Sequence, residues 1–65
     1  MSVNYPLHPI LLVDDEEEFL RTARFILRRE GMNNIITCSD PREVMEILEN
    51  QEISLAVLDI IMPHV

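Results

Sequence analysis

Acidic residues follow two separate apolar runs of this sequence. Asp14 and Asp15 come directly after the run ILLV at 10–13, and Asp59 comes directly after the largely apolar run at 53–58. Carboxylates that are brought together repel one another, and a divalent cation relieves that repulsion. Mg²⁺ prefers hard oxygen ligands and is usually held by one or two carboxylates together with a phosphate group. A carboxylate beside Mg²⁺ can also attack phosphorus as a nucleophile, so these aspartates indicate phosphoryl chemistry.

Simpler roles are open to some of these acids. Asp14 and Asp15 could merely cap the helix that follows them, and spacing alone leaves both interpretations open. The glutamates at 16–18 suit a helix N-terminus, where the macrodipole favours negative charge. Asp59 has no comparable role, because the segment after it, IIMP at 60–63, is a poor start for a helix.

The elements that must position the aspartates alternate along the chain. Three segments rich in apolar or β-branched residues are expected to be strands, and two segments with a helical apolar period are expected to be helices. The strands are expected at 10–13, 34–39 and 53–59, and the helices at 16–30 and 40–50. This alternation predicts the α/β class, with a parallel sheet and right-handed crossovers.

The order of the strands decides whether the aspartates meet. In open parallel sheets, ligand sites form beyond the carboxyl ends of the strands, near the point where the strand order reverses. If the first strand lies between the second and the third (order 2-1-3), Asp14, Asp15 and Asp59 leave neighbouring strands at the same edge. The three carboxylates would then converge, although more than forty residues separate Asp59 from the other two in the chain.

One apolar face of each expected helix should be buried. In the helix at 16–30 this face consists of Phe19, Leu20, Ala23, Ile26 and Leu27, and in the helix at 40–50 it consists of Val44, Met45, Ile47 and Leu48. Gly31 is expected to end the first helix in a conformation with positive φ. Asp40 is expected to cap the second helix, with Pro41 in its first turn.

Composition narrows the class of protein. The chain has 65 residues, 48% of them hydrophobic, which is enough for one domain at most. Its formal net charge is −7, which argues against direct nucleic-acid binding through phosphates. The single cysteine, Cys38, excludes an internal disulfide and is interpreted as a small apolar strand residue in a reducing compartment. Neither a signal peptide nor an apolar run of about 20 residues is evident, so we expect a cytoplasmic chain that does not enter the membrane.

Two motifs together resemble a known family. "ILLVDDEEEF" at 10–19 and "LAVLDIIMP" at 55–63 are similar to the receiver domain of two-component response regulators. The resemblance implies a flavodoxin-like, doubly wound parallel sheet and a signalling module rather than an enzyme. It implies that Asp59 accepts a phosphoryl group from a sensor histidine kinase. It further implies that Asp14 and Asp15 hold Mg²⁺, with Asp59 and the backbone carbonyl of Ile61 as further ligands.

The chain also departs from the family pattern. A receiver domain has five strands, whereas this chain ends soon after the third and contains no lysine to bind the phosphoryl group. We therefore expect an N-terminal tail at 1–8 and a truncated receiver domain at 9–65, impaired in phosphorylation and switching. Its third strand would become an exposed apolar edge, which favours a homo-oligomer or a domain-swapped dimer.

Two other functions compete with this interpretation. The half-domain could be purely structural, so that it only folds or self-associates and transfers no phosphoryl group. It could also be a hydrolase with Asp59 as nucleophile, but the next residues, Ile60, Ile61 and Met62, supply no second acid for general acid–base catalysis.

Overall fold

Three strands and two α-helices make up the part of the chain that the structure describes. The structure is a computed structural model that describes residues 4–58. In chain order the elements are β1 (Ile10–Val13), α1 (Glu17–Arg29), β2 (Ile35–Cys38), a 3₁₀ turn (Pro41–Glu43), α2 (Val44–Asn50) and β3 (Leu55–Leu58). Each lies within, or within one residue of, the segment expected from the sequence. Between residues 4 and 58 neither helix is long and apolar enough to cross a membrane.

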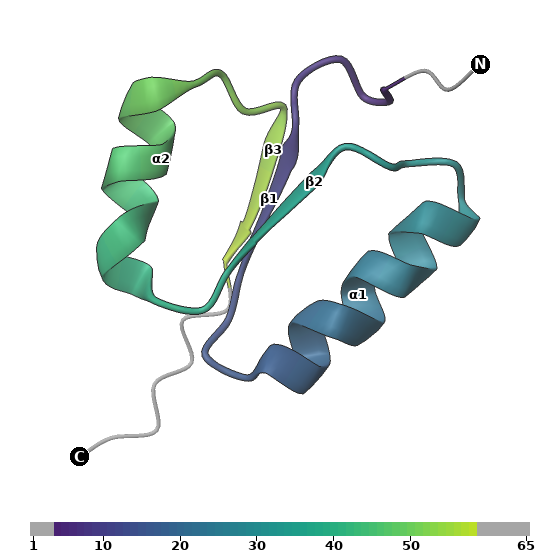
Figure 1. Ribbon diagram of the computed structural model, residues 1–65, viewed down its shortest axis with the longest axis horizontal. Coiled ribbons are helices and arrows are strands. Elements are labelled where there is room, and N and C mark those ends of the chain that lie inside the picture. Colours follow the sequence, from purple (N-terminus) through teal and green to yellow (C-terminus); the bar gives the residue numbers. More distant parts are fainter. Residues whose placement is uncertain (1–3, 59–65) are drawn as a thin grey trace.

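The three strands form one parallel sheet in the order β2-β1-β3 (Figure 1). Ile10 at the start of β1 lies opposite Ile35 and Leu55, and Val13 at its end lies opposite Cys38 and Leu58. The α/β class and the predicted strand order 2-1-3 are therefore confirmed. Because the strands are parallel and in register, their carboxyl ends meet at one edge of the sheet.

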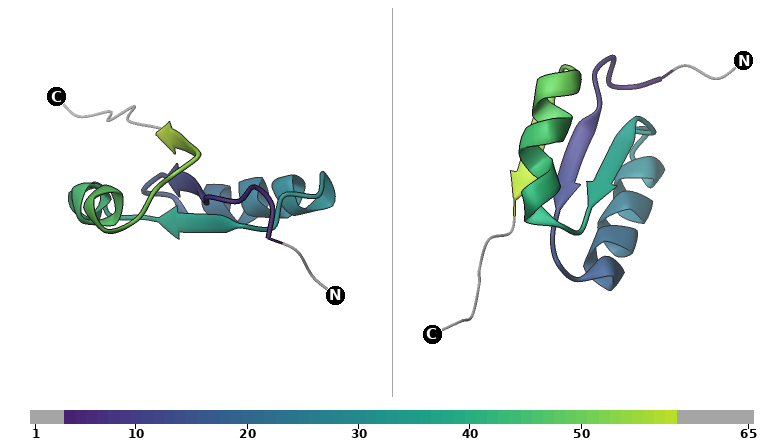
Figure 2. Two further views of the ribbon diagram at one scale, coloured as in Figure 1. Left: turned by 90° about the horizontal axis from the view of Figure 1, so that it is seen from above. Right: turned by 60° about the vertical axis from the view of Figure 1, so that its left-hand side comes forward.

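The core is built on β1, whose four residues are all buried. Side chains of a strand alternate between its two faces, so Ile10 and Leu12 pack with Leu20 of α1 on one side. Leu11 and Val13 pack with Cys38 on the other side, next to α2. The result is a three-layer arrangement with the sheet between the two helices (Figures 1 and 2).

Helix α1 ends as its sequence predicts. Gly31 has a φ of +96°, a conformation that only glycine adopts without steric cost. The N–H of Met32 donates to the carbonyl of Leu27 at 2.9 Å, and the N–H of Gly31 donates to the carbonyl of Arg28 at 3.0 Å. This pair of bonds is a Schellman motif, which satisfies carbonyls that the helix itself leaves free. It turns the chain sharply into β2.

The expected burial of the helix faces is only half correct. In α1, Leu20 is buried and Ala23 and Leu27 pack beside it, but Phe19 is 44% exposed and Ile26 is 51% exposed. In α2, Val44 and Ile47 reach the core, whereas Met45 and Leu48 are 63% and 42% exposed. The physical reason is the narrow sheet. Three strands of four residues cover one half of each apolar stripe, and nothing else among residues 4–58 covers the other half.

Strand β3 is exposed along its whole length. It pairs with β1 on one side, and no other strand among residues 4–58 lies on its opposite side. Leu55 and Val57 share the α1 side of the sheet, because they lie opposite Ile10 and Leu12. The exposed apolar edge predicted from the sequence is therefore present in the described part of the chain.

Residues before β1 are attached to the rest of the molecule by hydrogen bonds. The N–H of Tyr5 donates to Oδ1 of Asn33 at 2.8 Å, and the carbonyl of Tyr5 accepts from the N–H of Asn33 at 2.8 Å. The peptide bond between Tyr5 and Pro6 is cis. His8 lies 3.2 Å from a carboxylate oxygen of Glu52, and its carbonyl accepts from the hydroxyl of Ser54 at 2.6 Å. These contacts join the segment before β1 to the loops that precede β2 and β3.

Candidate functional site

Asp14 is held rigidly at the carboxyl end of β1. Its residue surface is only 4% exposed, and its N–H donates to the carbonyl of Cys38 at 3.1 Å, which extends the ladder between β1 and β2. Oδ1 of Asp14 accepts the N–H of Glu16 at 2.7 Å. This side-chain bond to the backbone two residues ahead is an Asx turn, and it directs the chain from the strand into α1.

The capping role that the sequence left open is not observed, because the N-cap of α1 is Glu16 and has no side-chain cap bond. The bond of Asp14 goes instead to the N–H of Glu16, just before the helix. It occupies one oxygen only, because Oδ2 of Asp14 accepts no hydrogen bond from residues 4–58. Asp15 is exposed at the same turn, and neither of its oxygens has a partner in this range. The two residues together therefore offer three uncommitted carboxylate oxygens beyond the end of β1.

The register of the sheet brings the neighbouring strand to the same edge. Val13, which precedes Asp14, lies opposite Leu58, which precedes Asp59 in the sequence. Asp59 and Ile61 themselves lie outside the described residues. The structure thus describes two of the predicted metal ligands, Asp14 and Asp15, and the end of the strand that leads to the other two.

The donor chemistry of this edge suits a hard divalent cation. Carboxylate oxygens are the preferred protein ligands of Mg²⁺, which needs only one or two of them because it keeps several waters. Across residues 4–58, no group of three or more His, Cys, Asp and Glu side chains could hold a metal ion. A site with three carboxylates therefore needs an acid from outside this range, and Asp59 is the acid that follows β3.

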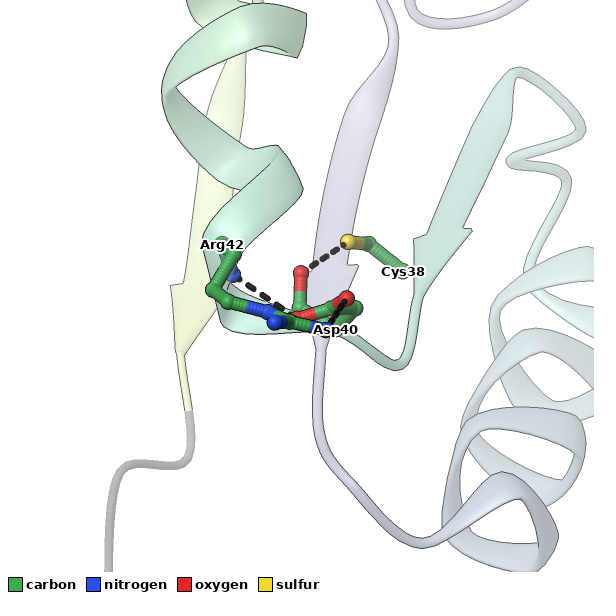
Figure 3. A network of polar contacts seen from close by, with 3 residues as sticks. All are labelled: Cys38, Asp40 and Arg42. Carbon is green, nitrogen blue, oxygen red and sulfur yellow. Dashed lines mark hydrogen bonds and ion pairs between the residues drawn. The ribbon is translucent and has the colours of Figure 1, made fainter.

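Cys38 belongs to a polar network at the end of β2 (Figure 3). Its thiol is buried, packs against Leu11 and Val13, and donates to the carbonyl of Asp40 at 3.0 Å. These contacts support its interpretation as a core strand residue rather than a reactive thiol.

Asp40 caps the second helical segment, as predicted. Its Oδ1 accepts the N–H of Arg42 at 3.0 Å, and its two oxygens also bind Nε and Nη2 of the same arginine at 3.1 and 2.9 Å. The side-chain hydrogen bonds from Arg42, followed by the backbone bond, lower the pKa of Asp40 below its usual value. The negative charge of Asp40 therefore compensates the positive charge of Arg42.

A groove that we did not predict from the sequence lies between α1 and β2. It is lined by Glu17, Leu20, Arg21, Arg24, Thr37 and Ser39, and we call it the α1–β2 groove. Its sequence signal was weak. The signal consists of Arg21 and Arg24, three residues apart in an expected helix, and of the hydroxyl residues at 37 and 39 in an expected strand. Neither spacing shows that the helix and the strand face each other.

Comparison with known proteins identifies one family. The family model for the response regulator receiver domain matches residues 10–65, which is most of the chain. No curated protein and no solved structure matches this chain. The matched range begins with β1 and includes Asp14, Asp15, Asp59 and Ile61.

Proposed function

Because this chain belongs to the response regulator receiver domain family, we propose that Asp59 accepts a phosphoryl group from a histidine kinase of a two-component system. One structural observation supports this proposal most directly. The parallel register of β1 and β3 sets Val13 opposite Leu58, so the residues after them start from the same edge of the sheet. The acidic pair Asp14 and Asp15 follows the first of these residues, and Asp59 follows the second.

The proposed reaction is a transfer between two side chains. A carboxylate oxygen of Asp59 attacks the phosphorus of a phosphohistidine, a P–O bond forms, and the P–N bond breaks with its electron pair left on the imidazole. Asp14, Asp15, Asp59 and the backbone carbonyl of Ile61 would hold Mg²⁺. When bound, this ion neutralises negative charge on the transferring phosphoryl oxygens. The hydrogen bond from Glu16 fixes the orientation of the Asp14 carboxylate before any ligand arrives.

We propose a signalling role, in which each chain accepts one phosphoryl group and does not turn over a substrate. We expect the transfer to be slow, because the 65 residues include no lysine to compensate the phosphoryl charge. The cytoplasm is the proposed location, since the kinase domain that phosphorylates a receiver needs nucleotide and Cys38 is unpaired.

Removal of the metal tests the proposed chemistry. We expect incubation with acetyl phosphate and Mg²⁺ to add one phosphoryl group per chain, and chelation by EDTA to reduce labelling to background. Asp15→Asn should raise the Mg²⁺ concentration for half-maximal labelling at least tenfold. Removing a residue that only hydrogen-bonds to a metal ligand typically lowers the metal affinity about 10–100-fold, so loss of a ligand itself should cost at least as much. Intact-mass spectrometry measures the labelled fraction.

Glu18→Gln is the matched control for this experiment. It removes the same charge from a neighbouring exposed acid in the first turn of α1, and we expect it to leave the Mg²⁺ requirement unchanged. Labelling that is insensitive to EDTA, or equal effects of the two substitutions, would show that Asp15 is not a metal ligand.

A structural role through self-association is the second candidate, and the exposure of β3 favours it. Leu55 is 56% exposed, Val57 is 42% exposed and Leu58 is 48% exposed, and the edge of β3 away from β1 has no partner strand among residues 4–58. Such an edge is a template for pairing with another chain. We propose that two copies pair there around a two-fold axis.

Sedimentation equilibrium tests this pairing. We expect a species with twice the mass of the chain at micromolar to millimolar concentration, and we expect Val57→Lys to return it to the single-chain mass, because charge on an edge strand opposes pairing. Met45→Lys is the matched control, since Met45 is 63% exposed and belongs to α2 rather than to the β3 edge. A single-chain mass for the unsubstituted protein would refute self-association and leave phosphotransfer untouched.

A further inference from the structure

The α1–β2 groove is a concave site with a composition unlike that of the aspartate edge. Its volume is about 410 Å³, and its lining combines two arginines, two hydroxyl residues, one leucine and one glutamate. Small-molecule sites usually measure about 300–1,000 Å³ and join an apolar surface to a few polar groups. The α1–β2 groove falls within this range of volume, and its lining is mostly polar, with Leu20 as its apolar residue.

Positive charge is concentrated on the helix that forms one wall of the groove. Four of the five arginines lie on α1, at positions 21, 24, 28 and 29, in a chain whose net charge is −7. Arg29 stacks on Phe25 at 5.9 Å, and the fifth arginine, Arg42, is paired with Asp40. Arg21 and Arg24 have neither an ion pair nor a hydrogen bond with any residue from 4 to 58.

The opposite wall of the groove supplies hydroxyl groups from β2 and from the residue that follows it. Thr37 lies opposite Leu12, on the face of the sheet that α1 covers. Ser39 is two residues further on and continues this alternation, whereas Cys38 between them points into the core on the α2 side. Two hydroxyl groups on the sheet side of the groove therefore face α1, the helix that carries Arg21 and Arg24.

Leu20 and Glu17 complete the lining. Leu20 is 5% exposed and gives the groove an apolar floor that excludes water from one side. Glu17 is one turn before Arg21 on α1, yet no carboxylate oxygen of Glu17 lies within 4 Å of a charged nitrogen in the described range. The groove therefore carries two unpaired guanidinium groups against one carboxylate.

We propose that the α1–β2 groove binds a small organic phosphate. Guanidinium groups match phosphate oxygens in charge and in planar geometry, and hydroxyl groups add donors that suit the remaining oxygens. The volume exceeds that of the phosphate group alone, so Leu20 can contact the organic part of the ligand. This site is separate from the proposed phosphoacceptor function, because none of its residues is Asp14, Asp15, Asp59 or Ile61.

The test uses inorganic phosphate as the probe, on the full chain and with EDTA present so that no metal links phosphate to the aspartate edge. We expect saturable changes in the NMR signals of the Arg21 and Arg24 side-chain Nε–H groups and of the Thr37 and Ser39 amides. Chloride at equal ionic strength should not reproduce them. Acetate reports whether a carboxylate serves as well, and binding of acetate equal to that of phosphate would refute the phosphate class.

Charge variants locate the site. We expect Arg21→Gln and Arg24→Gln each to weaken phosphate binding at least about tenfold, since each removes a charge-assisted bond. Arg28→Gln is the matched control, because it removes the same charge from α1 but does not line the groove, and it should change affinity by less than about threefold. Glu17→Gln should strengthen binding, because it removes the one negative charge of the lining.

Two results would overturn the proposal. One is the absence of saturable shifts with phosphate, and the other is an equal effect of the Arg28 and Arg21 substitutions, which would indicate non-specific attraction to a basic helix face. Asp59→Asn separates this site from the phosphoacceptor, because it should leave phosphate binding in the groove unchanged.

Discussion

Replacing Asp59 with asparagine is expected to reduce labelling by acetyl phosphate to background. An amide oxygen is a far weaker nucleophile than a carboxylate and cannot give a stable acyl phosphate, so the substitution removes the acceptor itself rather than slowing the transfer. The change is almost isosteric, and Asp59 follows the last described residue of β3, so it should leave the core around β1 intact. Intact-mass spectrometry after incubation with Mg²⁺ measures the loss.

A second aspartate provides the control for this variant. Asp40→Asn removes the same charge from a side chain that caps the 3₁₀ turn and whose two oxygens are bound by Arg42. We expect labelling to persist in it. If the Asp59 variant were still labelled, the acceptor would be another residue, and the proposed role of the β1–β3 edge would be wrong.

The parallel sheet could be predicted because it depends on few physical rules. Short continuous apolar runs indicated buried parallel strands, and helical periods between them indicated crossovers. The resemblance carried by "ILLVDDEEEF" and "LAVLDIIMP" then placed the first strand in the centre. The parallel register of Val13 with Cys38 and Leu58 confirms this arrangement.

The extent of burial could not be predicted in the same way. An apolar stripe shows which face of a helix is directed toward a sheet, but the width of the sheet determines how much of the stripe is covered. Phe19 and Ile26 repeat with the correct period, yet they lie on the flank of α1 opposite Arg21 and Arg24, away from β2. Among residues 4–58 the sheet extends beyond β1 on that side only by the exposed strand β3, and both side chains stay half exposed.

One part of the candidate functional residues could be predicted from the sequence, and another part could not. Its acids were visible as aspartates at the ends of strands, and the structure adds the Asx turn that fixes Asp14. The α1–β2 groove was not visible, because its residues gain significance only when Thr37 and Ser39 are known to face α1. A site built from carboxylates can be recognised from residue types at strand ends. A groove lined by arginines and hydroxyl residues can be recognised only when the sheet topology shows that these residues face each other.

Leu11→Ala is expected to have the largest effect on stability, lowering the free energy of unfolding by about 2–5 kcal/mol. Leu11 is fully buried in the central strand, and its cluster includes Val13 and Cys38 together with side chains of α2. Truncation removes apolar contacts and leaves a cavity that backbone on both sides of β1 keeps from closing. A domain of this length typically has only about 3–10 kcal/mol of stability, so the variant should be largely unfolded or close to it.

Leu55→Ala is the matched control for this prediction. It is the same chemical change in the adjacent strand, but Leu55 is 56% exposed, and we expect a loss below about 1 kcal/mol. Urea denaturation at one fixed protein concentration measures both variants, because pairing through β3 would make stability depend on concentration. Equal losses would mean that β3 is buried in solution as deeply as β1, which would direct attention to the partner that covers it. A large loss confined to Leu11 would show that β1, and not β3, carries the core on the α2 side of the sheet, next to the edge from which Asp14 and Asp15 project.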